Sequence, residues 1–231
     1  VVETQEYAAT SSLVDTMEEQ SLLESLLDNV KPPYREGTES RHYLISSPFR
    51  YPPLQHGSRF GTILMPSYFY ASETIQTALA ECAFYRFVFL NDLLEPYTQA
   101  IKSEHQSFAV QVDTSQCADL TRVYSTDIVL ALTSPNSYTF TQTMGDYLVN
   151  QKDVEMIRYT SARTPFNDTQ SSSVNVAIAS PSVIISDQPT QSVLWSCSSS
   201  SATVSFNARG FAPILFQKSD FLVEGVLPQL A

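Results

Sequence analysis

Three residues that could carry out chemistry, Arg59, Tyr70 and Glu81, follow one another at intervals of 11 residues. Glu81 stands in an apolar run, between Ala80 and Cys82. A carboxylate in such surroundings is costly unless it has a partner or a task. We therefore consider two interpretations of Glu81: a functional carboxylate, or a side chain that faces solvent on the margin of a helix.

Two arginines lie in a segment rich in glycine and proline, which begins at Ser47-Pro48 and ends at Gly61. Glycine and proline would fix an irregular backbone here, from which Arg50 and Arg59 project. The planar guanidinium fork matches phosphate oxygens two at a time. Loop arginines without such a role are also common, so this segment alone is a weak signal.

The chain is acidic, with a net charge of −11, yet 5 of its 13 basic residues lie within 29 positions. These are Lys31, Arg35, Arg41, Arg50 and Arg59. They predict either a solvated basic face or a pocket for a small anion. The overall charge argues against direct binding to nucleic acid, whose phosphates would repel the chain.

A third polar segment runs from Ile157 to Arg163 and contains Ser161. A strand that ends in small hydroxyl residues can open onto a site, although Ser161 could equally be an ordinary strand end.

Nothing in the cysteine and histidine spacing indicates a disulfide framework or a metal site. The residues concerned are Cys82, Cys117, Cys197, His42, His56 and His105. The first residues lack the pattern of a signal peptide, and no stretch has the roughly 18 apolar residues of a membrane helix. The sequence does not begin with Met, so we expect it to be trimmed or part of a longer chain. We expect a cytoplasmic protein without membrane contact.

Apolar residues recur at helical spacing from 13 to 30, which predicts an amphipathic first helix. Residues 41–70 are predicted to form strands and turns, and a helix should follow with Ser72 as its N-cap and Glu73 in its first turn. That helix is apolar nearly all round, as expected of a buried helix. Strands are predicted at 108–112, 155–159 and 174–179, a helix at 138–150, and a hairpin from 193–197 and 202–206. These elements indicate one mixed α/β domain.

Taken together, the polar segments resemble the RES family. The matching motifs are the turn Gly57-Ser58-Arg59-Phe60, the strand residue Tyr70, the helix segment Ala78-Leu79-Ala80-Glu81, Tyr159 to Arg163, Asn175 to Ala177, Trp195-Ser196-Cys197 and the tail Phe221 to Pro228. The resemblance runs from about Pro32 to the C-terminus. It divides the chain into an N-terminal amphipathic helical segment, residues 1–31, and a RES domain, residues 32–231. Many family members have Asn-Pro-Pro-Gly after the turn, where this chain has Gly61-Thr62-Ile63-Leu64.

The resemblance implies a single α/β (α+β) domain with an ADP-ribosyltransferase-like split sheet. It also implies an enzyme that cleaves the nicotinamide–ribose bond of NAD, as a glycohydrolase or a phosphorylase, and acts as the toxin of a toxin–antitoxin pair. Its expected partner is a helix-turn-helix antitoxin, and a homo-oligomer is compatible with the family. NAD would be the substrate, and no metal is expected.

The implied catalytic residues are Arg59, Glu81 and Ser161. The implied substrate-binding residues are Arg50, Tyr51, Tyr70 and Arg41, where either Arg50 or Arg41 corresponds to the upstream arginine of the family. Two alternatives remain open: ADP-ribosyl transfer to a protein, and a non-catalytic protein whose RES pocket has decayed.

Overall fold

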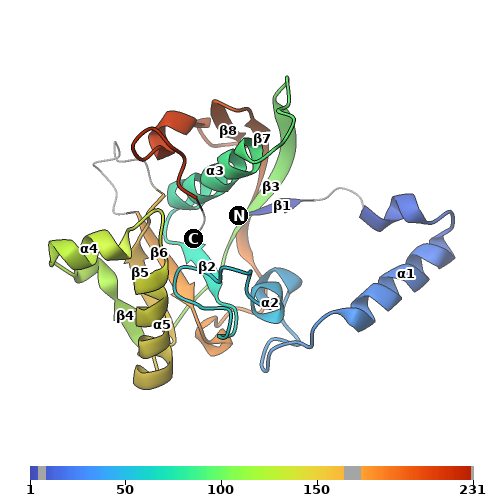
Figure 1. Ribbon diagram of the computed structural model, residues 1–231. Coiled ribbons are helices and arrows are strands. Elements are labelled where there is room, and N and C mark those ends of the chain that lie inside the picture. Colours follow the sequence, from blue (N-terminus) through green and yellow to red (C-terminus); the bar gives the residue numbers. More distant parts are fainter. Residues whose placement is uncertain (5–8, 164–172, 230–231) are drawn as a thin grey trace.

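The computed structural model describes residues 1–4, 9–163 and 173–229, which form two β-sheets with helices between and around them (Figure 1). One sheet has the strand order β1-β3-β7-β8-β9, and the other has the order β2-β6-β5-β4. The first sheet consists of β1 (Val2–Thr4), β3 (Ile101–Ala109), β7 (Thr190–Ser199), β8 (Thr203–Asn207) and β9 (Ile214–Gln217). The second consists of β2 (Phe69–Ser72), β4 (Cys117–Asp119), β5 (Met156–Thr160) and β6 (Val174–Ile178). The prediction of a single α+β domain with a split sheet is confirmed.

Helix α3 (Ile75–Asn91) follows β2 directly and packs against the five-stranded sheet (Figure 1). Its Leu79, Phe84 and Phe87 are almost fully buried in one cluster with Trp195 and Phe206. Its other side carries Glu81, which binds Ser161 and Asn175 at the smaller sheet, whereas Tyr85 and Phe89 are 47% and 50% exposed, so the predicted buried helix is confirmed only in part. This position brings any polar side chain on that side of α3 onto the smaller sheet.

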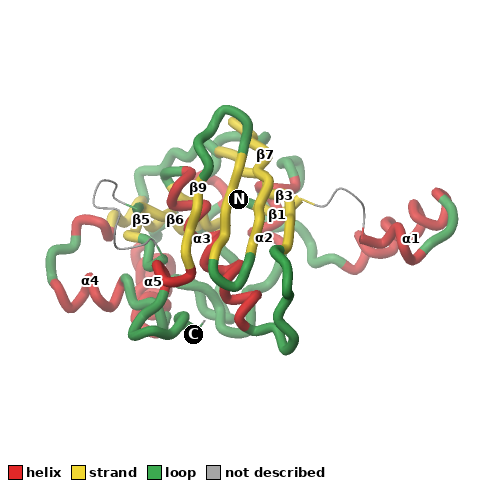
Figure 2. The backbone as a smooth tube through the Cα atoms, turned by 90° about the horizontal axis from the view of Figure 1, so that it is seen from above, coloured by secondary structure: helices red, strands yellow, loops and turns green. Residues whose placement is uncertain are grey.

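The four-stranded sheet is covered on both faces. One face packs against α2 (Tyr43–Arg50) through Ile45 and Phe49. The other face packs against α5 (Thr139–Lys152) and the segment around Phe60. Figure 2 shows α4 (Thr126–Leu132) and α5 together on the side of the molecule opposite α1.

The structure corrects the prediction for residues 41–70, which contain the helix α2. His42 caps α2, because its Nδ1 accepts a hydrogen bond from the backbone N–H of Leu44. Pro48 lies inside the helix and suggested a loop in the sequence. The burial of Leu44, Ile45 and Phe49 on one face stabilises the helix despite the proline.

The N-cap of α3 is Thr74 and not Ser72 as predicted. The hydroxyl of Thr74 accepts a hydrogen bond from the N–H of Thr77, whereas Ser72 is the last residue of β2. The strand predicted at 108–112 begins earlier, at Ile101, and ends at Ala109. The helix predicted at 138–150, the strands at 155–159 and 174–179 and the C-terminal hairpin are confirmed as α5, β5, β6 and β7–β8.

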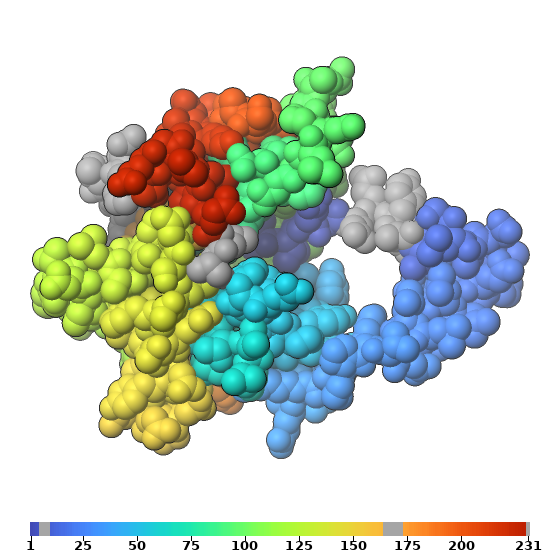
Figure 3. Space-filling view, in the orientation of Figure 1, coloured from blue at the N-terminus to red at the C-terminus, as the bar shows by residue number. Residues whose placement is uncertain are grey.

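Helix α1 (Met17–Val30) lies beside the main body of the molecule (Figures 1 and 3). Thr16 and Glu19 form a capping box at its start, which agrees with the predicted first helix. None of its residues is buried, and Leu22 and Leu26 are more than half exposed. Residues 2–4 add strand β1 to the larger sheet by pairing with β3, so the predicted N-terminal segment also contains a strand.

Within residues 1–4, 9–163 and 173–229, none of the helices combines the length and hydrophobicity that a membrane-spanning segment needs.

Candidate functional site

The carboxylate of Glu81 is held by side chains from two strands. Its Oε1 accepts hydrogen bonds from Ser161 Oγ at 2.7 Å and from Asn175 Nδ2 at 2.6 Å. Glu81 lies on α3, Ser161 follows the end of β5, and Asn175 lies on β6. The structure therefore brings together two of the predicted catalytic residues, which are 80 positions apart in the sequence.

The two groups that hold Glu81 are themselves fixed. Asn175 is 4% exposed, and its Oδ1 accepts a hydrogen bond from Ser72 Oγ at 2.6 Å. Ser72 and Tyr159 are the direct neighbours of Asn175 on β2 and β5, so the row across the sheet is set by strand register. Ser161 Oγ also accepts the N–H of Arg163. A charge held by oriented donors loses little energy to reorganisation during a reaction.

Arg59 is 8% exposed and binds backbone carbonyls. Its Nη1 donates to the carbonyl oxygens of Leu132 and Ser134, at 3.0 and 3.2 Å, and its Nη2 donates to Ser134 O at 3.2 Å. Its Cζ lies 4.9 Å from the ring centre of Tyr138. The guanidinium thus pins the connection between α4 and α5 to the turn at Gly57.

The Tyr70 hydroxyl lies in the same turn. It donates to Ser58 Oγ at 2.8 Å and accepts the N–H of Phe60 at 3.1 Å. Burial of the hydroxyl raises the pKa of Tyr70 to about 12, although the residue as a whole is 37% exposed. Tyr70 is consequently a neutral phenol at neutral pH, with part of its ring accessible.

Tyr159 connects these two groups of residues. Burial raises its pKa. Tyr159 is the neighbour of Asn175 on the adjacent strand, and its ring centre lies 4.8 Å from that of Phe60, which follows Arg59. Among the described residues, no hydrogen bond links Arg59 or Tyr70 directly to Glu81.

A cavity of about 800 Å³ opens beside the turn. Tyr51 and Tyr70, both predicted to bind substrate, line it together with Tyr43 and Tyr68. Most of the cavity wall is apolar, and Ser58 is among its polar contributors. Such a cavity suits a flat aromatic ring.

The five clustered basic residues do not share one pocket. Their partners are spread over the structure, and among these contacts only Lys31 and Arg50 share a partner, Asp28. Arg35 contacts Ser67 O and the Phe49 ring, Arg41 contacts Pro181 O and Ile184 O, Arg50 also contacts Pro32 O, and Arg59 contacts Leu132 O and Ser134 O. Backbone carbonyls accept hydrogen bonds from Arg35, Arg41, Arg50 and Arg59, so in this structure these arginines connect segments of the chain. A substrate contact by Arg41 or Arg50 remains a prediction.

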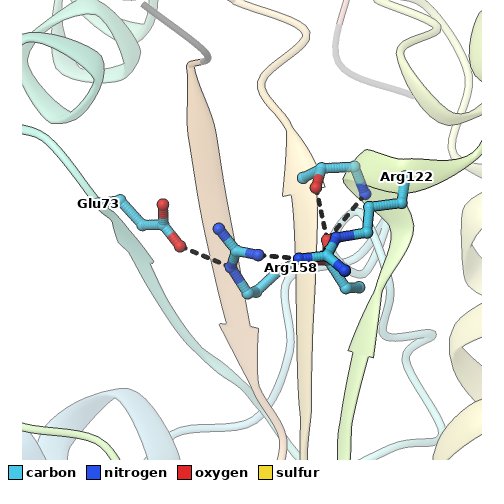
Figure 4. Close-up of polar contacts among 5 residues, drawn as sticks. Glu73, Arg122 and Arg158 are labelled. Carbon is cyan, nitrogen blue, oxygen red and sulfur yellow. Dashed lines mark hydrogen bonds and ion pairs between the residues drawn. The ribbon is translucent and has the colours of Figure 1, made fainter.

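Arg158, on β5 of the smaller sheet, forms a separate ion-pair network (Figure 4). Its Nε lies 2.6 Å from Glu73 Oε1, and its Nη1 lies 2.7 Å from Asp119 Oδ2. Arg122 also pairs with Asp119. Successive residues of a strand face opposite sides, so Arg158 points away from the face that carries Tyr159. Glu73, although only eight residues before Glu81, belongs to this network and not to the Glu81 cluster.

Sequence reasoning missed Asn175 as a site residue, and it missed Arg163. Both stand in the motifs that carry the family resemblance, Asn175 to Ala177 and Tyr159 to Arg163, which was the available signal. Arg163 is 4% exposed, and its Cζ lies 4.0 Å from the ring centre of Phe84 on α3. Within the described ranges, three or more His, Cys, Asp or Glu side chains do not gather into a possible metal site.

Two comparisons with known proteins bear on this site. Among curated proteins, none matches the chain. The sequence model of the RES domain matches residues 32–196, which include Arg59, Tyr70, Glu81, Ser161 and Asn175. The match covers well over half of the 231 residues, and its limits enclose every side chain of the Glu81 cluster. This chain belongs to the RES-domain family.

Proposed function

We propose that the chain cleaves the bond between nicotinamide and ribose in NAD. RES domains are NAD-related toxin domains, so an NAD-acting enzyme is the general class. The observation that carries the specific proposal is the Glu81 carboxylate, fixed by Ser161 at 2.7 Å and by Asn175 at 2.6 Å.

The chemistry of the bond explains why a fixed carboxylate is useful. When the C1′–N bond breaks, its electron pair goes to the pyridinium nitrogen, and nicotinamide leaves as a neutral molecule. Positive charge then develops on the ribose, as in other glycosyl cleavages. A preorganised carboxylate stabilises this charge more in the transition state than in the ground state. We assign this role to Glu81.

The remaining predicted residues take supporting roles in this proposal. Ser161 orients Glu81 or binds a ribose hydroxyl, and Tyr51 and Tyr70 contact the nicotinamide end of the substrate. Tyr51 and Tyr70 line the cavity, whereas Glu81 and Ser161 are not among its lining residues. Arg59 holds the connection between α4 and α5. Arg41 and Arg50 would have to exchange their carbonyl partners to reach a substrate phosphate.

The acceptor completes the reaction by adding an oxygen to C1′ and losing a proton. Water would give ADP-ribose, inorganic phosphate would give a phosphorylated ADP-ribose, and a protein side chain would become ADP-ribosylated. Analysis of the products by mass spectrometry distinguishes the three acceptors.

The test is to incubate the purified protein with NAD and to follow nicotinamide release. Glu81→Gln should lower kcat by about 10²–10³-fold, the typical effect of one preorganised electrostatic group, and should leave KM nearly unchanged. Glu73→Gln is the matched control, since this carboxylate pairs with Arg158 on the other face of the sheet. Full activity of Glu81→Gln would make the carboxylate structural and would refute the mechanism.

We further propose that the chain acts in the cytoplasm as the toxin of a toxin–antitoxin pair with a helix-turn-helix antitoxin. In this proposal residues 32–231 form the catalytic domain, to which the N-terminal segment adds strand β1. Membership of the RES family supports this proposal, because RES domains are NAD-related toxin domains. Because the chain has a net charge of −11, we expect any contact with DNA to be made by the partner.

A further inference from the structure

Neither terminal nitrogen of the Arg163 guanidinium has a hydrogen-bonding partner among the residues that the structure describes. The residue is 4% exposed. Its Cζ lies 4.0 Å from the ring centre of Phe84. A ring face attracts a cation but accepts no conventional hydrogen bond, so the donors of the fork remain unused.

Other arginines of the chain show how unusual this is. Arg158, five residues earlier, has carboxylates on both sides of its guanidinium (Figure 4). Arg59 and Arg41 donate to backbone carbonyls. A buried cation without hydrogen bonds is destabilising, and each such group in a native structure calls for an explanation.

Arg163 also lies close to the Glu81 cluster. Phe84 follows Glu81 by three residues on α3, which is a rise of about 4.5 Å along a helix. The N–H of Arg163 is bonded to Ser161 Oγ, the same atom that donates to Glu81. Burial raises the pKa of Tyr85, and both Glu81 and Arg163 are among the charges that act on its hydroxyl. Arg163 is therefore linked to the Glu81 cluster through Ser161, and its guanidinium contacts the same helix that carries Glu81.

We propose that Arg163 is the phosphate-binding residue of this site. The proposal rests on the proposed function, because it assigns the anionic part of the same ligand. The two terminal nitrogens of a guanidinium match two phosphate oxygens, and a phosphate would supply the missing partners. Two sources share this chemistry. One is the phosphate on the 5′ carbon of the ribose that carries nicotinamide, and the other is inorganic phosphate as the acceptor. Since both terminal nitrogens are buried, binding requires an opening of the surface beside Arg163.

Direct binding tests the site without any NAD cleavage. Inorganic pyrophosphate and inorganic phosphate are titrated separately into the whole chain by isothermal titration calorimetry. Arg163→Gln should weaken the binding of at least one anion by 10-fold or more, and Arg158→Gln should not. Equal binding by Arg163→Gln and the unmodified chain, or no binding of either anion by the unmodified chain, would overturn the proposal.

Kinetics then distinguish the two sources. If Arg163 holds the pyrophosphate of NAD, Arg163→Gln raises the KM for NAD at least 10-fold at constant phosphate. If it holds the acceptor, the variant loses the acceleration of nicotinamide release by inorganic phosphate, and its KM for NAD is unchanged. A variant with neither change refutes the assignment. A chain that binds pyrophosphate through Arg163 but cleaves no NAD would retain this site and refute the proposed function instead.

Stability separates a binding role from a structural one. Because the cation is unpaired, Arg163→Met should unfold at the same temperature as the unmodified chain or at a higher one, and phosphate should raise the midpoint of the unmodified chain alone. Arg163→Lys keeps the charge without the fork and should bind anions at an intermediate level. A lower midpoint for Arg163→Met, with phosphate stabilising both proteins equally, would make Arg163 structural.

Discussion

The side-chain amide of Asn175, on β6, binds both Ser72 on β2 and Glu81 on α3. Its Nδ2 donates to Glu81, and its Oδ1 accepts from Ser72. Both ends of the amide are therefore specified, which fixes its orientation on the buried strand β6. This makes Asn175 a positioning residue for Glu81 in the proposed reaction.

Replacement of Asn175 by Leu should lower kcat for nicotinamide release by about 10²-fold and change the KM for NAD much less. Leucine has a similar volume but removes the donor that orients Glu81, and small displacements of a catalytic group have effects of this size. Asn150→Leu serves as the control, because Asn150 is exposed on α5 and donates to Asp146 on the same helix. A purely structural Asn175 would instead lower thermal stability without changing kcat of the folded protein.

Arg59 was predicted from sequence to act on the substrate, but its hydrogen bonds lead to a prediction about stability. Arg59→Ala leaves the carbonyls of Leu132 and Ser134 without their donor and should cost about 2–3 kcal/mol of unfolding free energy. Arg122→Ala, which removes an exposed i,i+3 ion pair, should cost less than about 1 kcal/mol. Urea unfolding measures both. If Arg59→Ala were as stable as the unmodified chain and raised only the KM for NAD, Arg59 would bind the phosphates of the substrate, as the sequence suggested.

At the scale of elements, the sequence patterns predict which residues of a helix or strand are buried better than they predict the element against which these residues pack. The all-round apolar character of α3 predicted a buried helix, and the hairpin β7–β8 followed from its alternation and its serine-rich turn. The sequence did not predict the helix α2, because Pro48 is typical of a helix end. The burial of Ile45 and Phe49 stabilises this helix despite the proline.

The Glu81 cluster could be predicted in its residue types but not in its contacts. Spacing and motif indicated Glu81 and Ser161, yet the bond between Asn175 and Ser72 depends on strand register between residues 103 positions apart. Similarly, β1 has only three residues, too few for any alternation to appear in the sequence. Long-range pairing of this kind follows from the fold and not from local pattern.

Helix α5 positions the Arg59 turn through an unusually close approach at Gly145. A Cβ placed there would lie 2.0 Å from the carbonyl oxygen of Phe60. Gly145→Ala should therefore push α5 away from the turn, destabilise the protein by about 1–3 kcal/mol and lower NAD cleavage, since Tyr70 binds the N–H of Phe60. Thr143→Ala, on the exposed side of the same helix, should do neither. Chemical unfolding and nicotinamide release check the two effects, and an unchanged Gly145→Ala variant would show that the contact is not needed.

The whole molecule is acidic, and many of its basic side chains bind carbonyl or carboxylate groups of the same chain. The net charge of −11 and the partners of the five clustered basic residues leave little positive surface on that part of the chain. An electrostatic interaction with DNA is correspondingly unfavourable. For a toxin of this family, harm to a cell should then come from the small-molecule substrate and not from nucleic acid.

In the proposed toxin role, expression of the chain alone in a bacterial host should arrest growth, and the cellular NAD content should fall before growth stops. The reason is that, in the proposed reaction, each enzyme molecule cleaves many NAD molecules, so catalytic amounts suffice to drain the pool. Glu81→Gln should abolish both effects at the same level of folded protein, whereas Glu73→Gln, on the Arg158 side of the sheet, should retain them. Co-expression of the adjacent reading frame should restore growth by forming a complex that no longer releases nicotinamide. Growth arrest by Glu81→Gln with normal NAD content would mean that the harm arises from some property other than the carboxylate, and a folded, unmodified chain that is harmless alone would contradict the toxin role.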